Sequence, residues 1–294
     1  MPFIGADGLL SLTRSEDVIA RTRAFAASGP VLCNGVAALQ GEVVFLEGEG
    51  VGTTPPRFCG SDEATTCCIV YLRVPDGSRA ACAHLDCEEA VAPFLEACEA
   101  TGFWAAASGS GSGGGPPIEV HLVGSTSGWP SSAHLVAVVL KGLHAVPVGL
   151  RLVTACVLSE NEVKGVAADA PRRPPLHAGA ALDVVTGELR PARFVSFGPD
   201  EVARRSRCFV QGGEGCRVAY KGGAWAPVPL PGGTSQGSDA LKWGMRRSAL
   251  AMLAAMDDKK LLKVTSTSPE AEADGYVERM RDILRFIEQR MEAI

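Results

Sequence analysis

Short apolar runs, each closed by a turn, constrain the fold of this chain more than any other sequence feature. The run Cys67–Val74 is apolar and β-branched, the turn Pro75-Asp76-Gly77 follows it, and Arg79–His84 comes next. Two such runs around a tight turn predict a β-hairpin. With 34 glycines and 19 prolines among 294 residues, the chain favours a turn-rich, strand-rich body over a helical bundle.

Elsewhere in the chain, some segments show the periodicity of a helix and others that of a strand. Helical patterns lie at 17–27, 88–100, 133–144 and 199–207, and strand patterns at 42–46, 118–123, 151–158, 180–185, 188–194 and 217–228. At the C-terminus, Ser268 is expected to cap a helix that begins at Pro269 and presents one apolar stripe. We therefore expect a single α/β domain over residues 1–294 with a mixed or antiparallel sheet, interrupted by flexible insertions near 108–117 and 229–238.

Charge and composition exclude several classes of protein. The chain carries 33 acidic and 28 basic residues without a basic block, which argues against nucleic-acid binding. Apolar runs such as Ala133–Leu140 are far shorter than the ~20 residues that span a bilayer, and the N-terminus lacks the pattern of a secretory signal. We expect a soluble intracellular protein, with its 10 cysteines as reduced thiols.

The segment before the first hairpin strand suggests chemistry. Cys67 follows a loop of small polar residues, where backbone N–H groups can stabilise an oxyanion. The hairpin can bring His84 beside Cys67 as general base, and Ser61 can orient the imidazole. These three residues are the candidate catalytic set. In a chain with 10 cysteines, the alternative is that Cys67 only fills the core.

A zinc site competes for the same region. Cysteine and histidine are the usual ligands of structural zinc, and several lie close together in the chain: Cys67, Cys68, Cys82, His84 and Cys87. However, no C-x₂-C knuckle is present, and Cys67 and Cys68 should point to opposite faces of a strand. We expect no metal and no cofactor, and keep a zinc-stabilised, non-catalytic interaction domain as an alternative.

Seven segments resemble the protein N-terminal asparagine amidohydrolase family and occur in the family's order. They are GSDEATTC (60–67), AHLD (83–86), IEVHLVG (118–124), LRLVTACV (150–157), LDVVTGELRPARF (182–194), DDKKLL (257–262) and STSPEAE (266–272). The spacing of Ser61, Cys67 and His84 is also similar to that of bacterial chemoreceptor glutamine deamidases. These resemblances imply an α+β sandwich with a mixed, largely antiparallel sheet, in which Cys67 is the nucleophile and His84 the catalytic histidine.

The resemblance also implies a substrate. Hydrolysis of the side-chain amide of an N-terminal asparagine would give N-terminal aspartate and ammonia, with a link to the arginyltransferase and ubiquitin ligase of the N-degron pathway. A cytoplasmic location is expected, with the nucleus as an addition. A deamidase of internal glutamine or asparagine is the alternative. Expected substrate-binding residues are Asp62, Thr66, Asp86, Ser266 and Ser268, because a bound α-ammonium needs acidic or oxygen-bearing neighbours. Pro2 is added to this set because the family also begins Met-Pro.

Overall fold

The computed structural model divides into two compact units. It describes residues 15–47, 56–107, 116–164, 174–210, 216–227, 247–266, 268–270, 272 and 274–292. One unit comprises Met1–Phe197 and Gly215–Ala226, and the other Gly198–Glu214 and Pro227–Ile294. The expected single domain over residues 1–294 stays a prediction. Apart from Pro116 and Pro117, the expected insertions near 108–117 and 229–238 lie outside the described residues.

A seven-stranded mixed sheet forms the centre of the first unit. In spatial order its strands are β12 (Ala224–Trp225), β11 (Arg217–Lys221), β3 (Glu42–Glu47), β6 (Arg79–Leu85), β5 (Cys68–Arg73), β7 (Ile118–Gly124) and β8 (Leu150–Val157). The hairpin expected from the turn at Pro75–Gly77 is confirmed, since β5 and β6 pair antiparallel with Ile69 opposite His84. Only the β7–β8 and β3–β11 pairs in this sheet are parallel.

A second, five-stranded sheet is built largely from strands too short to stand out in the sequence. Its spatial order is β1 (Val31–Cys33), β10 (Leu189–Phe194), β9 (Ala180–Asp183), β4 (Phe58–Ser61) and β2 (Val36–Ala38). Gly60 is required in β4, because a Cβ there would lie 2.1 Å from the Ala180 carbonyl oxygen and 2.6 Å from the Phe194 ring. The sequence predicts a loop of small polar residues before Cys67; in the structure this segment begins within β4.

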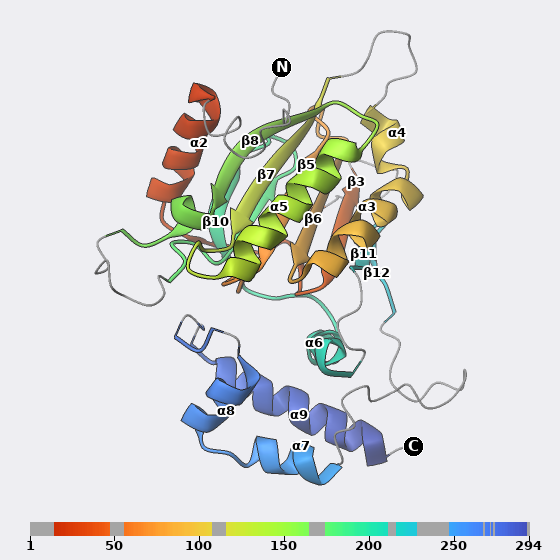
Figure 1. Ribbon diagram of the computed structural model, residues 1–294. Helices are drawn as coiled ribbons and strands as arrows, with labels where there is room; N and C mark the ends of the chain where they lie inside the picture. Colours follow the sequence, from red (N-terminus) through yellow and green to blue (C-terminus); the bar gives the residue numbers. More distant parts are fainter. Residues whose placement is uncertain are drawn as a thin grey trace. The chain divides into compact units, whose positions relative to one another are not determined.

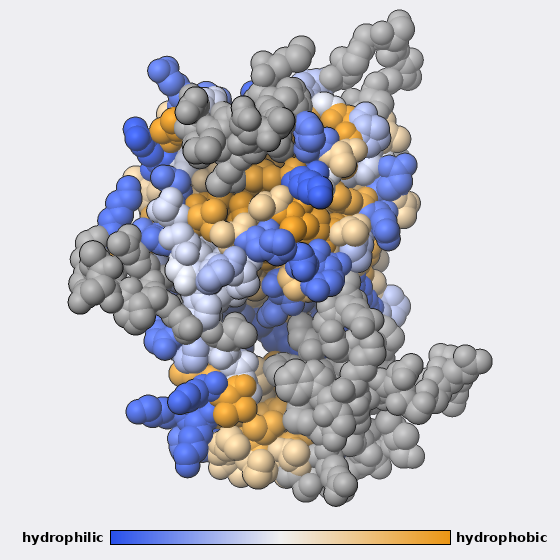
Figure 2. All heavy atoms as spheres, in the orientation of Figure 1, coloured by the Kyte–Doolittle hydropathy of each residue, from blue (hydrophilic) through white to orange (hydrophobic). Residues whose placement is uncertain are grey.

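Helices cover one face of the seven-stranded sheet. Figure 1 shows α3 (Val91–Ala100) and α5 (Pro130–Ala145) lying across that face. The other helical elements of this unit that the structure describes are α2 (Glu16–Ala27), which packs on β8, η1 (Glu88–Ala90), α4 (Phe103–Ala107) and η2 (Leu158–Asn161). In the region of α5, Figure 2 shows apolar residues at the surface among charged ones. In this helix Ala133 and Ala137 are exposed.

The two faces of the seven-stranded sheet are buried in separate cores. On one face, Cys68, Val70 and Leu72 pack with residues of the helices. On the other face, Ile69 and Tyr71 pack with residues of the five-stranded sheet such as Leu182. Helices, large sheet and small sheet therefore form three layers, which confirms the α+β sandwich with mixed sheets.

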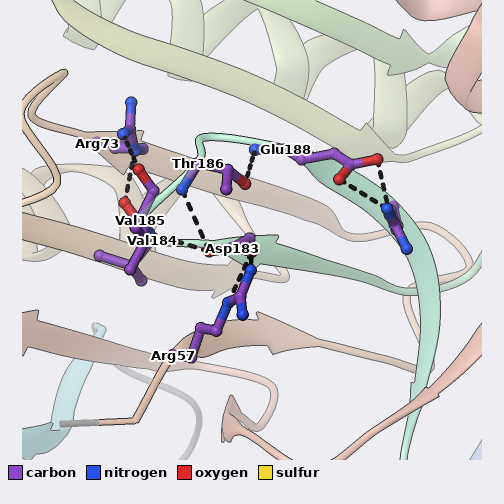
Figure 3. A network of polar contacts seen from close by, with 8 residues as sticks. Arg57, Arg73, Asp183, Val184, Val185, Thr186 and Glu188 are labelled. Atoms are coloured by element: carbon purple, nitrogen blue, oxygen red, sulfur yellow. Dashed lines mark hydrogen bonds and ion pairs between the residues drawn. The ribbon is translucent and has the colours of Figure 1, made fainter.

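Arg73 of β5 ties the two sheets together. Its buried guanidinium donates to the carbonyls of Val184 and Val185, both at 2.7 Å, at the tip of the β9–β10 hairpin (Figure 3). Its third hydrogen bond, also 2.7 Å, goes to the Glu119 carboxylate. In the same network, Asp183 accepts from the backbone N–H groups of Val185 and Thr186, closing the hairpin turn.

The second unit is helical in its described part. It contains α6 (Glu201–Val210), α7 (Arg247–Ala254), α8 (Asp258–Thr265) and α9 (Tyr276–Glu292) around a small apolar core of Leu250, Leu261, Met280, Ile283, Leu284 and Ile287. The apolar stripe expected on the last helix is confirmed. The expected start was wrong: the helix begins at Tyr276, because Gly275 has a φ of +81°, outside helical geometry. Ser268 therefore does not cap it.

Candidate active site

Ser61 and His84 meet although they belong to different sheets. Ser61 ends β4 of the five-stranded sheet, and His84 lies near the end of β6 in the seven-stranded sheet. Ser61 Oγ is 2.7 Å from His84 Nδ1 and 2.7 Å from the carbonyl oxygen of Ala38. Both side chains are buried, at 0% and 3% exposed.

These two distances fix the tautomer of the imidazole. A carbonyl oxygen can only accept, so Ser61 donates its one hydroxyl hydrogen to Ala38. Ser61 Oγ must then accept from His84 Nδ1–H. In neutral His84 the lone pair therefore lies on Nε2, as a general base requires.

Cys67 lies on the same side of the sheet as His84. Ile69 is directly opposite His84 in the β5–β6 register, and Cys67 precedes Ile69 by two residues, so the three side chains share one face. Cys67 packs with Ile69 in the core between the two sheets, whereas Cys68 packs with the helices. Such diagonal cross-strand neighbours are within reach of each other.

The backbone of Cys67 is held by the segment that follows β7. The Cys67 carbonyl accepts from the backbone N–H of Ser125 at 2.7 Å and from its hydroxyl at 3.2 Å. Gly124 has a φ of +106°, and a Cβ there would lie 2.5 Å from the Cys67 carbonyl oxygen. This glycine is needed for the close approach that fixes Cys67.

Several other cysteines are more deeply buried than Cys67. Desolvation raises the pKa of Cys59, Cys68 and Cys156 to about 12 in each case. Such thiols stay protonated and unreactive at neutral pH. Cys67 is 7% exposed, and it lies on the sheet face that also carries a buried histidine.

Asp86 brings a carboxylate to the same end of the hairpin. It directly follows β6, and its Oδ2 accepts from Gln40 Nε2 at 3.0 Å. Its Oδ1 is buried and has no hydrogen-bond partner in the part of the chain that the structure describes. Continuing the β5–β6 register by one residue past the Cys68–Leu85 pair sets Asp86 opposite Cys67. Gln40 was not predicted as a site residue from the sequence. Its position just before the strand pattern at 42–46 is the sequence feature that could have indicated it.

The other expected binding residues lie in different settings. Asp62 accepts from the Glu63 backbone N–H at 2.7 Å, and burial raises the pKa of its carboxyl. The Thr66 carbonyl accepts from the Ser132 hydroxyl at 3.0 Å. Ser266 belongs to the second unit, where its hydroxyl donates to Glu272 and accepts from the backbone N–H of Ser268. Pro2 lies outside the described residues.

Within the described ranges, no group of three or more His, Cys, Asp and Glu side chains could hold a metal ion, so the zinc alternative has no ligand set there. In the same ranges, no helix is long and apolar enough to cross a membrane.

A thiol and an imidazole on one sheet, and a buried hydroxyl from the facing sheet, are gathered in the core of this α+β sandwich. The sequence model of "protein N-terminal asparagine amidohydrolase" matches residues 40–222 and 238–293. The chain belongs to this family and is an enzyme. It is 26% identical over 262 residues to the protein N-terminal asparagine amidohydrolase of Mus musculus, covering 84% of this chain and 75% of the mouse protein. The protein of the same name from Homo sapiens is 25% identical over 260 residues, with the same coverage.

Proposed function

We propose that this enzyme hydrolyses the side-chain amide of an N-terminal asparagine in proteins or peptides, releasing ammonia and leaving N-terminal aspartate. The observation that carries the proposal is the Ser61–His84 contact on the sheet face that also bears Cys67. The names of the relatives supply the substrate class.

The proposed reaction proceeds through a thioester. His84 Nε2 takes the proton of Cys67, and the thiolate attacks the carboxamide carbon. The tetrahedral intermediate collapses as the imidazolium protonates the departing ammonia. Water, deprotonated by His84, then attacks the thioester, which regenerates the Cys67 thiol and yields the aspartate carboxylate.

Asp86 is the proposed partner of the substrate's α-ammonium. Its buried Oδ1 is an acceptor without a donor among the described residues, and Gln40 holds the other oxygen in place. An ammonium would supply the missing donor and compensate the charge. Asp62 already receives a backbone N–H and is the weaker candidate. Pro2, Thr66, Ser266 and Ser268 remain proposals for further substrate contacts.

The cellular part of the proposal follows from the product. N-terminal aspartate would be passed to an arginyltransferase and then to a ubiquitin ligase of the N-degron pathway. The location proposed for this step is the cytoplasm, with the nucleus as an addition.

Matched peptides that start with Asn, Gln or acetyl-Asn test the activity through ammonia release. A fixed distance between ammonium and amide favours Asn over Gln, because a misplacement of about 1 Å can cost ~10²-fold in rate. Acetyl-Asn and internal Asn should not react, since the charge is lost and the acceptor is left unpaired. Equal ammonia release from Asn and acetyl-Asn peptides would reject the proposal in favour of a deamidase of internal side chains.

A further inference from the structure

Glu42 places a buried carboxylate beside the candidate catalytic histidine. It is the first residue of β3, is 1% exposed and lies directly opposite His84 in the antiparallel β3–β6 register. Directly opposed residues project from the same face of a sheet. The faces agree, because Val44 of β3 and Cys82 of β6 both belong to the core between the sheets.

A chain of hydrogen bonds also joins Glu42 to His84 by way of a single peptide unit. Glu42 Oε2 accepts from the backbone N–H of Leu39 at 3.0 Å. The carbonyl of the same peptide unit, that of Ala38, accepts the Ser61 hydroxyl at 2.7 Å, and Ser61 Oγ accepts from His84 Nδ1 at 2.7 Å. Every donor in this chain points towards Glu42.

Hydrogen bonds that share one direction polarise each other. An N–H that donates to a carboxylate makes the carbonyl of its own peptide a stronger acceptor, which strengthens the next bond in turn. The carboxylate therefore reinforces the orientation of Ser61, and through it the Nδ1–H tautomer of His84. Its negative charge, one strand away, also favours the protonated imidazole.

From this geometry we infer that Glu42 is a positioning residue, which holds the Ala38–Leu39 peptide, Ser61 and His84 in one array and stabilises the His84 imidazolium. The inference rests on the proposed function, in which that imidazolium donates a proton to departing ammonia. Glu42 itself does not touch the substrate in this scheme.

Three other titratable groups near His84 do not supply the negative charge that Glu42 supplies. Burial raises the pKa of Cys59 to about 12 and that of Tyr71 and Cys82 well above their ordinary values, so these neighbours stay neutral. Among the described residues, two charged groups on neighbouring strands are Asp86, which follows β6, and Arg217 of β11, which is opposite Glu42 and one strand further from His84.

Histidine NMR of ¹⁵N-labelled protein tests the inference without any substrate, so an inactive enzyme would not obscure the result. Glu42→Gln keeps an acceptor for the Leu39 N–H and removes the charge; Glu47→Gln, at the exposed end of the same strand, is the matched control. We expect the His84 titration midpoint to fall by about one pH unit in Glu42→Gln and to stay in place in Glu47→Gln. With an active substrate, the acid limb of kcat/KM should move to lower pH in the same variant, because His84 must be neutral to take the proton of Cys67.

Two results would overturn the inference. One is a His84 midpoint that is the same in Glu42→Gln and in the unsubstituted protein. The other is a hydrogen on Nε2 rather than Nδ1 in neutral His84 of the unsubstituted protein, a measurement that holds even if Glu42→Gln does not fold.

Discussion

Cys67 and Cys68 are neighbours in the chain, yet their side chains belong to different cores. Cys67 faces the five-stranded sheet together with Ile69, and Cys68 faces the helices together with Val70. This alternation along one strand decides which thiol shares a face with His84.

Replacing each cysteine by alanine should separate the two thiols. We expect Cys67→Ala to lower kcat on the order of 10⁴-fold or more, as for other nucleophiles that act together with a base. Cys68→Ala should keep most of its activity and lose some stability, because it removes only a buried sulfur from the helix-facing core. Thermal melts of both variants control for folding. An inactive Cys68→Ala beside an active Cys67→Ala would reject the assignment.

Asp86→Asn should weaken recognition of the amino group. Its amide oxygen can still accept from Gln40, which turns an NH₂ group towards the site where the ammonium would bind. We expect kcat/KM for peptides with a free N-terminal Asn to fall roughly 10–100-fold, the range for a lost hydrogen bond to a charged group. Asp62→Asn is the control, and an equal loss in both variants would contradict the role of Asp86.

The sequence predicted the long elements and the chemistry better than the way in which the site is assembled. The hairpin that carries His84, the helices and the last apolar stripe have clear periodicity. Strands such as β2 and β4 are three and four residues long, too short for a periodic signal, and their partners are distant in sequence. The placement of Ser61 therefore required tertiary structure. The roles of Glu42 and Gln40 also depend on register, which one sequence does not specify.

Arg73→Met should strongly destabilise the first unit. The substitution leaves the Val184 and Val185 carbonyls without the guanidinium that donates to them. Among the described residues, the mostly buried Glu119 then keeps Arg151 as its one ion-pair partner. Breaking a buried ion pair on one side costs about 3–5 kcal/mol. Chemical denaturation should show this loss, whereas Arg57→Met, which removes an exposed guanidinium from Asp183, should change little. Equal effects of both variants would refute the proposed role of Arg73 in holding the sheets together.

His121 should make the protein sensitive to acid. Burial, and then the charges of Arg73, Arg21 and Arg151, lower its pKa from 6.5 to about 3. Below pH 6.5 the unfolded chain takes up a proton at this residue that the folded chain refuses, so stability is complete above that pH and falls towards pH 3. The slope is at most about 1.4 kcal/mol per pH unit. His121→Asn should flatten the dependence of unfolding free energy on pH between 6 and 4; an unchanged slope would show that His121 does not contribute.

Because Ser61 and His84 come from separate sheets, catalysis depends on the layers being docked and not only on each sheet being formed. A folding intermediate in which both sheets are formed but not yet docked would have no enzymatic activity. During refolding, the rate at which ammonia release returns would therefore report the docking of the layers. Far-ultraviolet circular dichroism measures secondary structure and would not detect this step.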